Sequence, residues 1–189
     1  MSFFILYIKI KNYLMFNSKP NNAKYNQGNY IPKYPEKLIK LNNEGGIYFR
    51  SGLEKKIMVW MDMNVNIIQW GAECLEIPYQ LTHFDKGDAK IKNHRYFPDF
   101  YYKIKKSSGI IEEVVMEAKP YKDYENVIKL DEGRLSVPEN GLKKLKNFEY
   151  DLKEASRNRE KWNAMIAWCN KKGIKFIVVT EKHLQKLNL

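Results

Sequence analysis

Apolar residues at helical spacing predict a helix from about residue 52 to residue 64. Its buried stripe consists of Leu53, Ile57, Trp60 and Met61. Ser51 and Glu54, three residues apart, form a capping-box pattern that marks where the helix begins. This segment is the first regular element that the pattern predicts with a defined start.

The C-terminal part of the chain predicts helices around one buried strand. Residues 142–152 form a helix rich in lysine, and residues 156–172 form a helix with an apolar stripe that Gly173 ends. Residues 174–179 are an apolar run of strand length, and a last short helix follows Thr180.

The middle of the chain predicts a sheet. Short runs rich in β-branched and aromatic residues indicate strands, and polar clusters with glycine indicate the turns between them. The predicted segments are strands at 67–70, 74–79, 95–104 and 110–119, turns at 85–93 and 105–109, and a long irregular loop at 121–141. The order helix, strands, helices, strand, helix is typical of the α/β class, with one mixed sheet flanked by helices.

The first 46 residues differ in character from the rest. Residues 1–14 are apolar and aromatic, but they lack the features of a signal peptide and are too short to cross a bilayer. Residues 16–46 are rich in Asn, Lys, Pro and Gly, which favours an extended segment. We therefore expect an extended basic arm over residues 1–46 and a single domain over residues 47–189.

The net charge of +11 is unevenly distributed along the chain. Residues 1–50 contain eight Lys or Arg and two acidic residues, and residues 142–175 contain ten and four, so each segment carries +6. Residues 51–141 carry −2, with 13 basic and 15 acidic residues. Basic flanks around a mildly acidic centre favour a polyanionic partner, with a solubilising lysine-rich surface as the alternative.

Charged residues on two predicted neighbouring strands indicate a reaction centre. Alternation of side chains places Asp99 on one face of the strand 95–104 and Tyr96 on the other. It places Glu117 and Lys119 on one face of the return strand. If the hairpin pairs these faces, the three charged side chains meet near one end of the sheet. A charged pair that ends a hydrophobic strand is costly unless it is paired or bound to a metal.

Two carboxylates of this kind suit Mg²⁺ or Mn²⁺, which prefer oxygen ligands. We expect Asp99 and Glu117 to be metal ligands and Glu54 to be a third acidic group at the metal or its waters. Lys119 would help to deprotonate a water or stabilise the charge that develops on a phosphate. Glu54 has an alternative role as the glutamate of the capping box.

Basic residues at two places are candidate DNA contacts. His94 and Arg95 precede Asp99 and are candidates to contact the scissile phosphate, with a solvated basic pair as the alternative. The second candidate is the basic face of the predicted helices between residues 143 and 161, against simple solvation. Its residues are Lys143, Lys144, Lys146, Arg157, Arg159 and Lys161.

Pro98-Asp99 and Glu117-Ala118-Lys119 resemble the defining motif of the PD-(D/E)XK nuclease superfamily. The segment 48–54 looks like the first helix of that family, and the run from Trp70 to Asp99 is similar to transposon-end-cutting endonucleases. The similarity to head-completion nucleases of T-even-type tailed phages is greater and covers roughly residues 27–187. Residues 1–14 and 127–139 depart from the pattern, and Gly52 stands where serine is frequent.

The resemblance implies a restriction-endonuclease-like core and a Mg²⁺- or Mn²⁺-dependent DNA nuclease that acts on packaged or terminal phage DNA. Implied partners are DNA and phage head or portal proteins, without a membrane. The implied location is the host cytoplasm during phage assembly, or the virion, and not the outside of the cell. Two alternatives stay open: a non-catalytic head-completion protein that binds DNA or portal, and a transposon- or junction-type endonuclease. The choice between monomer and dimer is also open.

Overall fold

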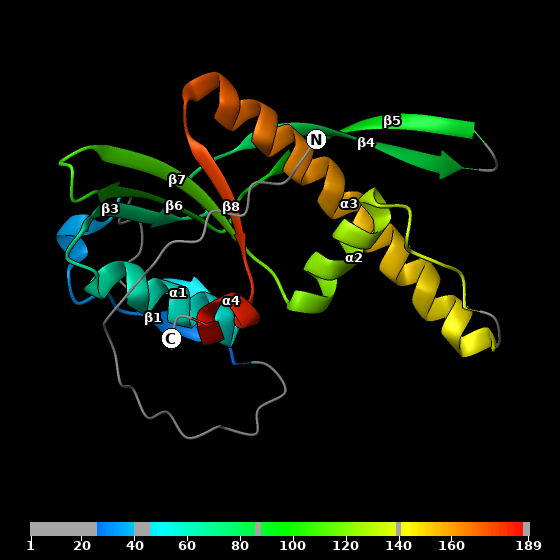
Figure 1. Ribbon diagram of the computed structural model, residues 1–189, viewed down its shortest axis with the longest axis horizontal. Coiled ribbons are helices and arrows are strands. Elements are labelled where there is room, and N and C mark those ends of the chain that lie inside the picture. Colours follow the sequence, from blue (N-terminus) through cyan, green and yellow to red (C-terminus); the bar gives the residue numbers. More distant parts are fainter. Residues whose placement is uncertain (1–25, 40–45, 86–87, 139–140, 187–189) are drawn as a thin grey trace.

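A four-stranded sheet in the order β3-β6-β7-β8 forms the centre of the molecule (Figure 1). The computed structural model describes residues 26–39, 46–85, 88–138 and 141–186. The first three strands of the sheet are antiparallel neighbours, and β8 runs parallel to β7. The strands are β3 (Ile67–Ala72), β6 (Phe100–Lys105), β7 (Ile111–Ala118) and β8 (Lys175–Val179). The mixed α/β class predicted from the sequence is confirmed.

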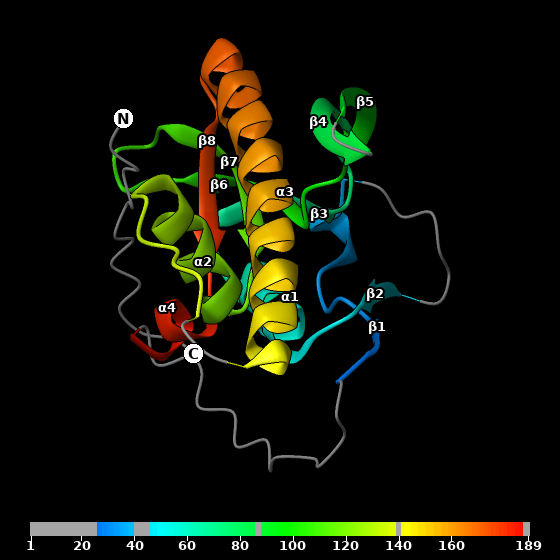
Figure 2. The same cartoon turned by 90° about the vertical axis from the view of Figure 1, so that its right-hand side faces the viewer.

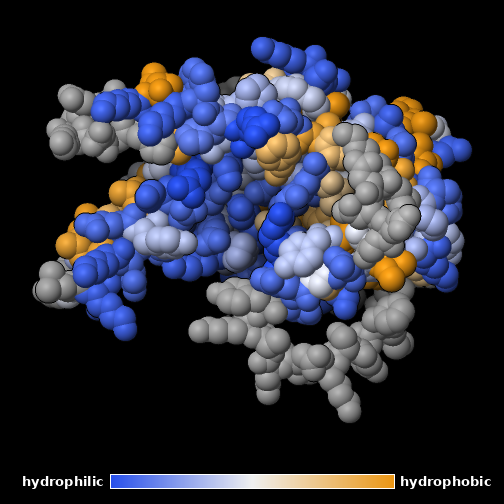
Figure 3. Space-filling model, turned by 180° about the vertical axis from the view of Figure 1, so that it is seen from behind, coloured by the Kyte–Doolittle hydropathy of each residue, from blue (hydrophilic) through white to orange (hydrophobic). Residues whose placement is uncertain are grey.

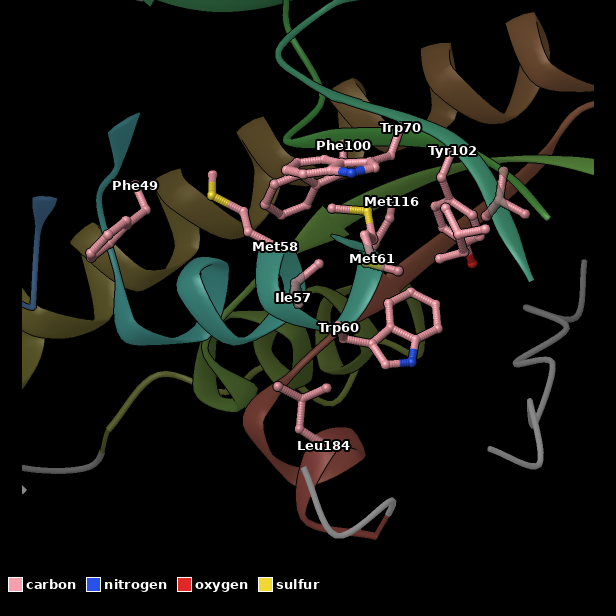
Figure 4. Packing of buried hydrophobic residues seen from close by; sticks show 12 residues of the cluster. Phe49, Ile57, Met58, Trp60, Met61, Trp70, Phe100, Tyr102, Met116 and Leu184 are labelled. Atoms are coloured by element: carbon pink, nitrogen blue, oxygen red, sulfur yellow. The ribbon is translucent and has the colours of Figure 1, made fainter. Parts of the chain in front are cut away.

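One face of this sheet packs against the first and last helices. Trp60 and Met61 of α1 are buried against Trp70 of β3 and Phe100 of β6, and Leu184 of α4 completes the cluster (Figure 4). The apolar stripe predicted for the first helix therefore faces the core. The helices of the structure are α1 (Gly52–Met63), α2 (Tyr121–Asp131), α3 (Leu142–Lys172) and α4 (Glu181–Lys186).

The opposite face of the sheet packs against α3. Val115 of β7 and Tyr101 of β6 lie in one cluster with Met165 of α3, and α2 packs against α3 beside them. Because side chains alternate along a strand, Glu117 lies on the same face of β7 as Val115. The acidic residue is thus directed to the α3 side of the sheet.

A long β-hairpin extends from the domain beside α3 (Figures 1 and 2). β4 (Ile77–Asp85) pairs with β5 (Asp88–Tyr96) along its whole length, in a sheet of its own. The predicted strand at 74–79 followed by a polar turn at 85–93 was therefore wrong. Among the hairpin side chains whose burial the structure describes, the buried ones lie at the base, and the sequence further out has no alternation of apolar and polar residues to reveal a strand.

Two predictions about the helices were also wrong. The loop predicted over residues 121–141 contains α2, which runs for 11 residues and buries Val127. The helices predicted at 142–152 and 156–172 are one helix of 31 residues, because the residues between them do not interrupt a helix. Gly173 ends α3 in the left-handed conformation, as predicted.

Residues 26–39 lie against the domain. β1 (Gly28–Tyr30) pairs with β2 (Ile47–Phe49), and the short 3-10 helix η1 (Pro35–Lys37) follows β1. These contacts cross the predicted boundary at residue 46, and the division into an arm and a domain stays a prediction. The predictions for residues 1–14 lie outside the described residues. Within the described ranges, no helix is both long enough and apolar enough to cross a membrane.

Candidate active site

Asp99 lies in a bend between two strands. β5 ends at Tyr96 and β6 begins at Phe100, so the single strand predicted over residues 95–104 was wrong. Pro98 lies in this break, and proline has no backbone N–H to donate to a strand ladder. The bend therefore replaces the strand at the position where the acidic residue stands.

The bend nevertheless brings Asp99 to the acidic end of β7. The register of β6 and β7 pairs Phe100 with Met116, so one further step places Asp99 opposite Glu117. A carboxylate oxygen of Asp99 accepts a hydrogen bond from the backbone N–H of Ala118 at 2.7 Å. The two acidic side chains thus approach the same end of the sheet from neighbouring segments.

Glu117 is 2% exposed and has two side-chain partners. Its Oε1 lies 3.0 Å from Nζ of Lys119, and its Oε2 accepts a 2.6 Å hydrogen bond from the hydroxyl of Tyr96. The structure therefore brings Asp99, Glu117 and Lys119 together at one end of the sheet. Burial of a charged pair of this kind is costly and marks a candidate functional site.

Tyr96 is a component of the site that the sequence reasoning assigned to the other face. Alternation was counted through one continuous strand, which separated Tyr96 from Asp99. The break at Pro98 resets that alternation, so the buried hydroxyl of Tyr96 reaches Glu117. Burial and the charge of Glu117 raise the pKa of Tyr96 far above its ordinary value, so this hydroxyl is a donor at all working pH values.

The environment of Asp99 opposes its ionisation. Burial, and next the charge of Glu117, raise the pKa of Asp99 to about 8, against the opposing effects of the Ala118 N–H and Lys119. Burial alone would lower the pKa of Lys119, but its pairing with Glu117 and the charge of Asp99 hold that pKa above its ordinary value. Asp99 and Glu117 are therefore a strained acidic pair that additional positive charge would stabilise.

Glu54 begins α1 as the capping pattern predicted. Its backbone N–H donates to Ser51 Oγ at 3.1 Å. Its carboxylate accepts hydrogen bonds from the Ser51 hydroxyl at 2.9 Å and from the Arg50 backbone N–H at 2.8 Å. Its charge also contributes to the raised pKa of Asp99, so Glu54 lies within electrostatic reach of the acidic pair.

Residues 64–181 match the family model described as the N-terminal domain of TnsA-like endonucleases. The chain belongs to this family. It is also 33% identical over 160 residues to the head completion nuclease of Enterobacteria phage T4, an alignment that covers 85% of this chain and 94% of that protein. No solved structure gives a significant match. Membership confirms the predicted resemblance to PD-(D/E)XK nucleases and the restriction-endonuclease-like core, a mixed central sheet flanked by helices.

The acidic pair of this TnsA-like domain has the chemistry of a divalent-cation site. Burial, and next the charge of Glu117, raise the pKa of Asp99, and a cation beside both carboxylates would offset both effects. Mg²⁺ in proteins often uses only one or two carboxylates and keeps several waters. In the described ranges no group of three or more His, Cys, Asp or Glu side chains is placed to hold a metal. Asp99 and Glu117 therefore fit the cation, whereas the ligand role of Glu54 stays a prediction.

Two cations lie at the rim of the site. Nζ of Lys161, on α3, lies 5.5 Å from the ring centroid of Tyr96. Burial and the nearby charge of Lys119 lower the pKa of Lys161, which indicates that its ammonium group lies close to the acidic centre. Arg50 pairs with Glu73, and this pairing, followed by smaller contributions from other acidic groups that include Asp99, raises its pKa. Lys161 belongs to the DNA surface predicted from the sequence, whereas no sequence pattern indicates a role for Arg50.

The other predicted DNA contacts divide between two elements. His94 and Arg95 lie on opposite faces of β5: His94 stacks on Tyr79 with ring centroids 5.4 Å apart, whereas Arg95 lies 3.7 Å from Glu76. On α3, Lys143, Lys144 and Lys146 are exposed, while Arg157 pairs with Glu154 and Arg159 with Glu160.

Proposed function

We propose that this protein is a divalent-metal-dependent DNA nuclease that acts in the completion of phage heads. The observation that carries the proposal is the meeting of Asp99, Glu117 and Lys119 at one buried end of the sheet. The nuclease fold of the family and the name of the T4 relative support the reaction and the setting. Implied partners are DNA and phage head or portal proteins, in the host cytoplasm during assembly or in the virion.

Asp99 and Glu117 are the proposed metal ligands. A bound Mg²⁺ or Mn²⁺ ion would stabilise negative charge on a phosphate and lower the pKa of a water. Tyr96 fixes the orientation of Glu117 through its 2.6 Å hydrogen bond, and the Ala118 N–H fixes Asp99. Holding both carboxylates in one geometry before the substrate arrives reduces the reorganisation that the reaction requires.

Lys119 is the proposed charge-stabilising group. Its pKa lies above the ordinary value, so the ammonium group stays protonated at neutral pH. A protonated lysine donates hydrogen bonds to phosphate oxygens but cannot accept a proton from water. The electrostatics therefore favour stabilisation of developing charge over general-base catalysis. Glu54 keeps an auxiliary role, because it caps α1 and adds negative charge near Asp99.

The test is cleavage of linear and supercoiled DNA by purified protein with Mg²⁺, with Mn²⁺ and with EDTA. We expect cleavage only with a metal ion, and at least about a hundredfold loss in Asp99→Asn and Lys119→Met, because each variant removes a group that acts on the reacting phosphate. Asp131→Asn and Lys122→Met are matched controls, since both side chains are exposed. Cleavage by Asp99→Asn and Lys119→Met at the wild-type rate, or cleavage in EDTA, would contradict the proposal.

A different result would support one of the alternatives. Protein that binds DNA but does not cut it under any metal condition would indicate a non-catalytic head-completion protein. Cleavage confined to particular DNA sequences or to branched junctions would favour a transposon- or junction-type endonuclease, a reading that the TnsA-like family match also supports.

A further inference from the structure

The β4–β5 hairpin and α3 diverge from a shared base and leave a hollow between them. Figure 3 shows this hollow from behind, lined by hydrophilic surface between the two projections. We propose that the hairpin and α3 are the two sides of a clamp that holds duplex DNA and leads it to the acidic pair. This inference rests on the proposed nuclease function, and it assigns a role to a hairpin that no sequence pattern revealed.

The hairpin has one face that turns toward α3. Its register places Tyr79 opposite His94, and Tyr96 follows His94 on the same face two residues later. Tyr79 and Tyr96 are buried in the cluster that contains Met165 of α3, which fixes the direction of this inner face. Side chains two residues apart share a face, so the inner face continues outward through Lys92 and then Lys90. Both lysines are exposed.

The outer face of the hairpin is less basic. On β5 it carries Arg95, Asn93 and Ile91, all exposed. Arg95 is the single cation among them, and it lies 3.7 Å from the carboxylate of Glu76, which offsets its charge. Two of the three Lys or Arg residues of β5, Lys90 and Lys92, therefore lie on the face that looks toward α3.

A basic stripe on α3 faces the hairpin. Arg157 lies within electrostatic reach of Tyr79, and Lys161 lies over the ring of Tyr96, so both are on the hairpin side of the helix. Residues at spacings of three, four and seven share a helix face, which extends the same stripe to Lys153 and Lys146. Lys143 and the acidic Glu154 also lie on this stripe, and Glu154 pairs with Arg157 at 3.0 Å.

Arg159 lies on the other side of α3, two residues from both Arg157 and Lys161. A separation of two residues turns a helix by about 200°, so Arg159 points away from the hairpin. The basic face predicted from the sequence over residues 143–161 is therefore not one surface. Its members divide into a stripe that faces the hairpin and residues, such as Arg159, that do not.

The two rows of cations converge on the proposed reaction centre. At the inner end of the α3 stripe, Nζ of Lys161 lies 5.5 Å from the ring centroid of Tyr96, whose hydroxyl donates to Glu117 at 2.6 Å. From Lys146 to Lys161 the stripe is about 22 Å long at 1.5 Å per residue, which corresponds to roughly six base pairs of duplex. A polyanion held along both rows would reach the acidic pair at the base of the hollow.

Duplex DNA is the partner that this arrangement fits. The facing cations are mostly lysines, which are suited to phosphates as point charges, rather than arginines placed to recognise base edges. Two facing rows suit the two phosphate backbones of a duplex, whereas a single strand offers one. We therefore expect tight, salt-dependent binding of duplex DNA with little dependence on sequence.

The test measures binding of a fluorescent 20-base-pair duplex to the full chain in EDTA, over a series of NaCl concentrations. In Lys90→Gln/Lys92→Gln we expect affinity to fall about tenfold or more. The slope of log affinity against log salt should become shallower by about 2, because two phosphate contacts are lost. Lys105→Gln/Lys106→Gln removes two exposed lysines at the turn between β6 and β7, outside the clamp, and should leave both quantities unchanged.

Two further comparisons separate position from charge. Ile91→Lys/Lys92→Ile keeps composition and net charge but moves one cation to the outer face, so we expect binding to weaken several-fold. Lys153→Gln should weaken binding, whereas Arg159→Gln, on the same helix, should not. Wild-type affinity in the exchanged hairpin, or equal effects of Lys153→Gln and Arg159→Gln, would overturn the clamp.

A single strand of the same length is the probe for the partner class. Weaker binding of the single strand supports the clamp, and equal or tighter binding with the same variant effects overturns the assignment to duplex. Because binding in EDTA needs no cleavage, the clamp and the nuclease centre fail separately. If the hairpin variants bind DNA normally, the effect of Asp99→Asn on cleavage is not contradicted. If Asp99→Asn cleaves normally, the effect of the hairpin variants on binding is not contradicted.

Discussion

Asp62 and Asp99 are both acidic residues shielded from solvent, but their surroundings differ. Asp62, near the end of α1, is fully buried, and its carboxylate accepts hydrogen bonds from the Tyr30 hydroxyl at 2.6 Å and the backbone N–H groups of Lys33 and Tyr34 at 2.7 and 3.1 Å. Asp99 accepts one backbone hydrogen bond and lies beside a second carboxylate.

The comparison shows how to distinguish a structural buried acid from a functional one. Neutral donors around Asp62 replace the water that it lost and attach residues 30–34 to α1, so these hydrogen bonds stabilise the fold. At Asp99 the nearby charge of Glu117 opposes ionisation, so its charge destabilises the fold until a cation arrives. Substitution of the two residues should therefore change stability in opposite directions.

The largest expected effect on stability comes from Asp62→Ala. The variant leaves buried donors from Tyr30, Lys33 and Tyr34 without an acceptor, and we expect the free energy of unfolding to fall by about 3 kcal/mol. Urea denaturation measures this, and Asp62→Asn, which keeps one acceptor oxygen, should lose less. If Asp62→Ala is as stable as the wild type, Asp62 does not stabilise the fold, and the proposed difference between Asp62 and Asp99 is wrong.

The second prediction concerns Asp99 and pH in the absence of metal. An aspartate has a pKa near 4 in the unfolded chain and about 8 here, so its stabilising contribution is present below pH 4 and is lost as pH rises to 8. Asp99→Asn cannot ionise. We therefore expect its Tm in EDTA to exceed that of the wild type by about 4 °C or more at pH 9, and to match it near pH 4.

Added Mg²⁺ or Mn²⁺ supplies the control for this prediction. At pH 8 the metal should raise the Tm of the wild type, because it binds the folded state, and should have little effect on Asp99→Asn. If the wild type and Asp99→Asn have the same Tm from pH 5 to pH 9 in EDTA, the ionised Asp99 side chain does not destabilise the folded protein, which would contradict this prediction.

The acidic centre was predictable from the sequence because its chemistry is local. Glu117 lies near the end of an apolar strand, Lys119 follows directly after that strand, and Pro98-Asp99 precedes the neighbouring strand, so the pairing of the two strands brings them together. The capping pattern of Ser51 and Glu54 is equally local. What failed was the strand boundary at Pro98, and that single break concealed the role of Tyr96.

Contacts that depend on distant segments were not predictable in the same way. Asp62 is bonded to residues about 30 positions earlier in the chain, and nothing in its own helix pattern indicates that a separate segment covers it. The hairpin was missed because the strands of its outer part pair only with each other, so their side chains need no apolar alternation. The spacing of apolar residues in a sequence reflects which side chains are buried. It therefore indicates neither the segment that covers Asp62 nor the outer part of the hairpin.

The smallest effects come from one lysine near each of the two acidic sites, Lys37 near Asp62 and Lys161 near Glu117. Lys37 donates from Nζ to the carbonyls of Asp62 at 2.6 Å and Asn64 at 3.0 Å, beyond the last turn of α1. Lys37→Met should therefore lower Tm by about 3 °C, because the carbonyls at a helix end lose a cationic donor, and should leave cleavage unchanged.

Lys161→Met should show the reverse. Burial and the charge of Lys119 lower the pKa of Lys161, which means that its positive charge is less stable in the folded protein than in water. Removing this charge should therefore not reduce Tm. If Lys161 stabilises a phosphate at the reaction centre, kcat should fall about tenfold with a smaller change in KM, since the lost interaction strengthens as charge develops. If Lys161→Met has the wild-type kcat, Lys161 contributes to DNA binding and not to the chemical step. If Lys161→Met lowers Tm as much as Lys37→Met does, Lys161 has a structural role like that of Lys37. Its position near the acidic pair would then not indicate a role in catalysis.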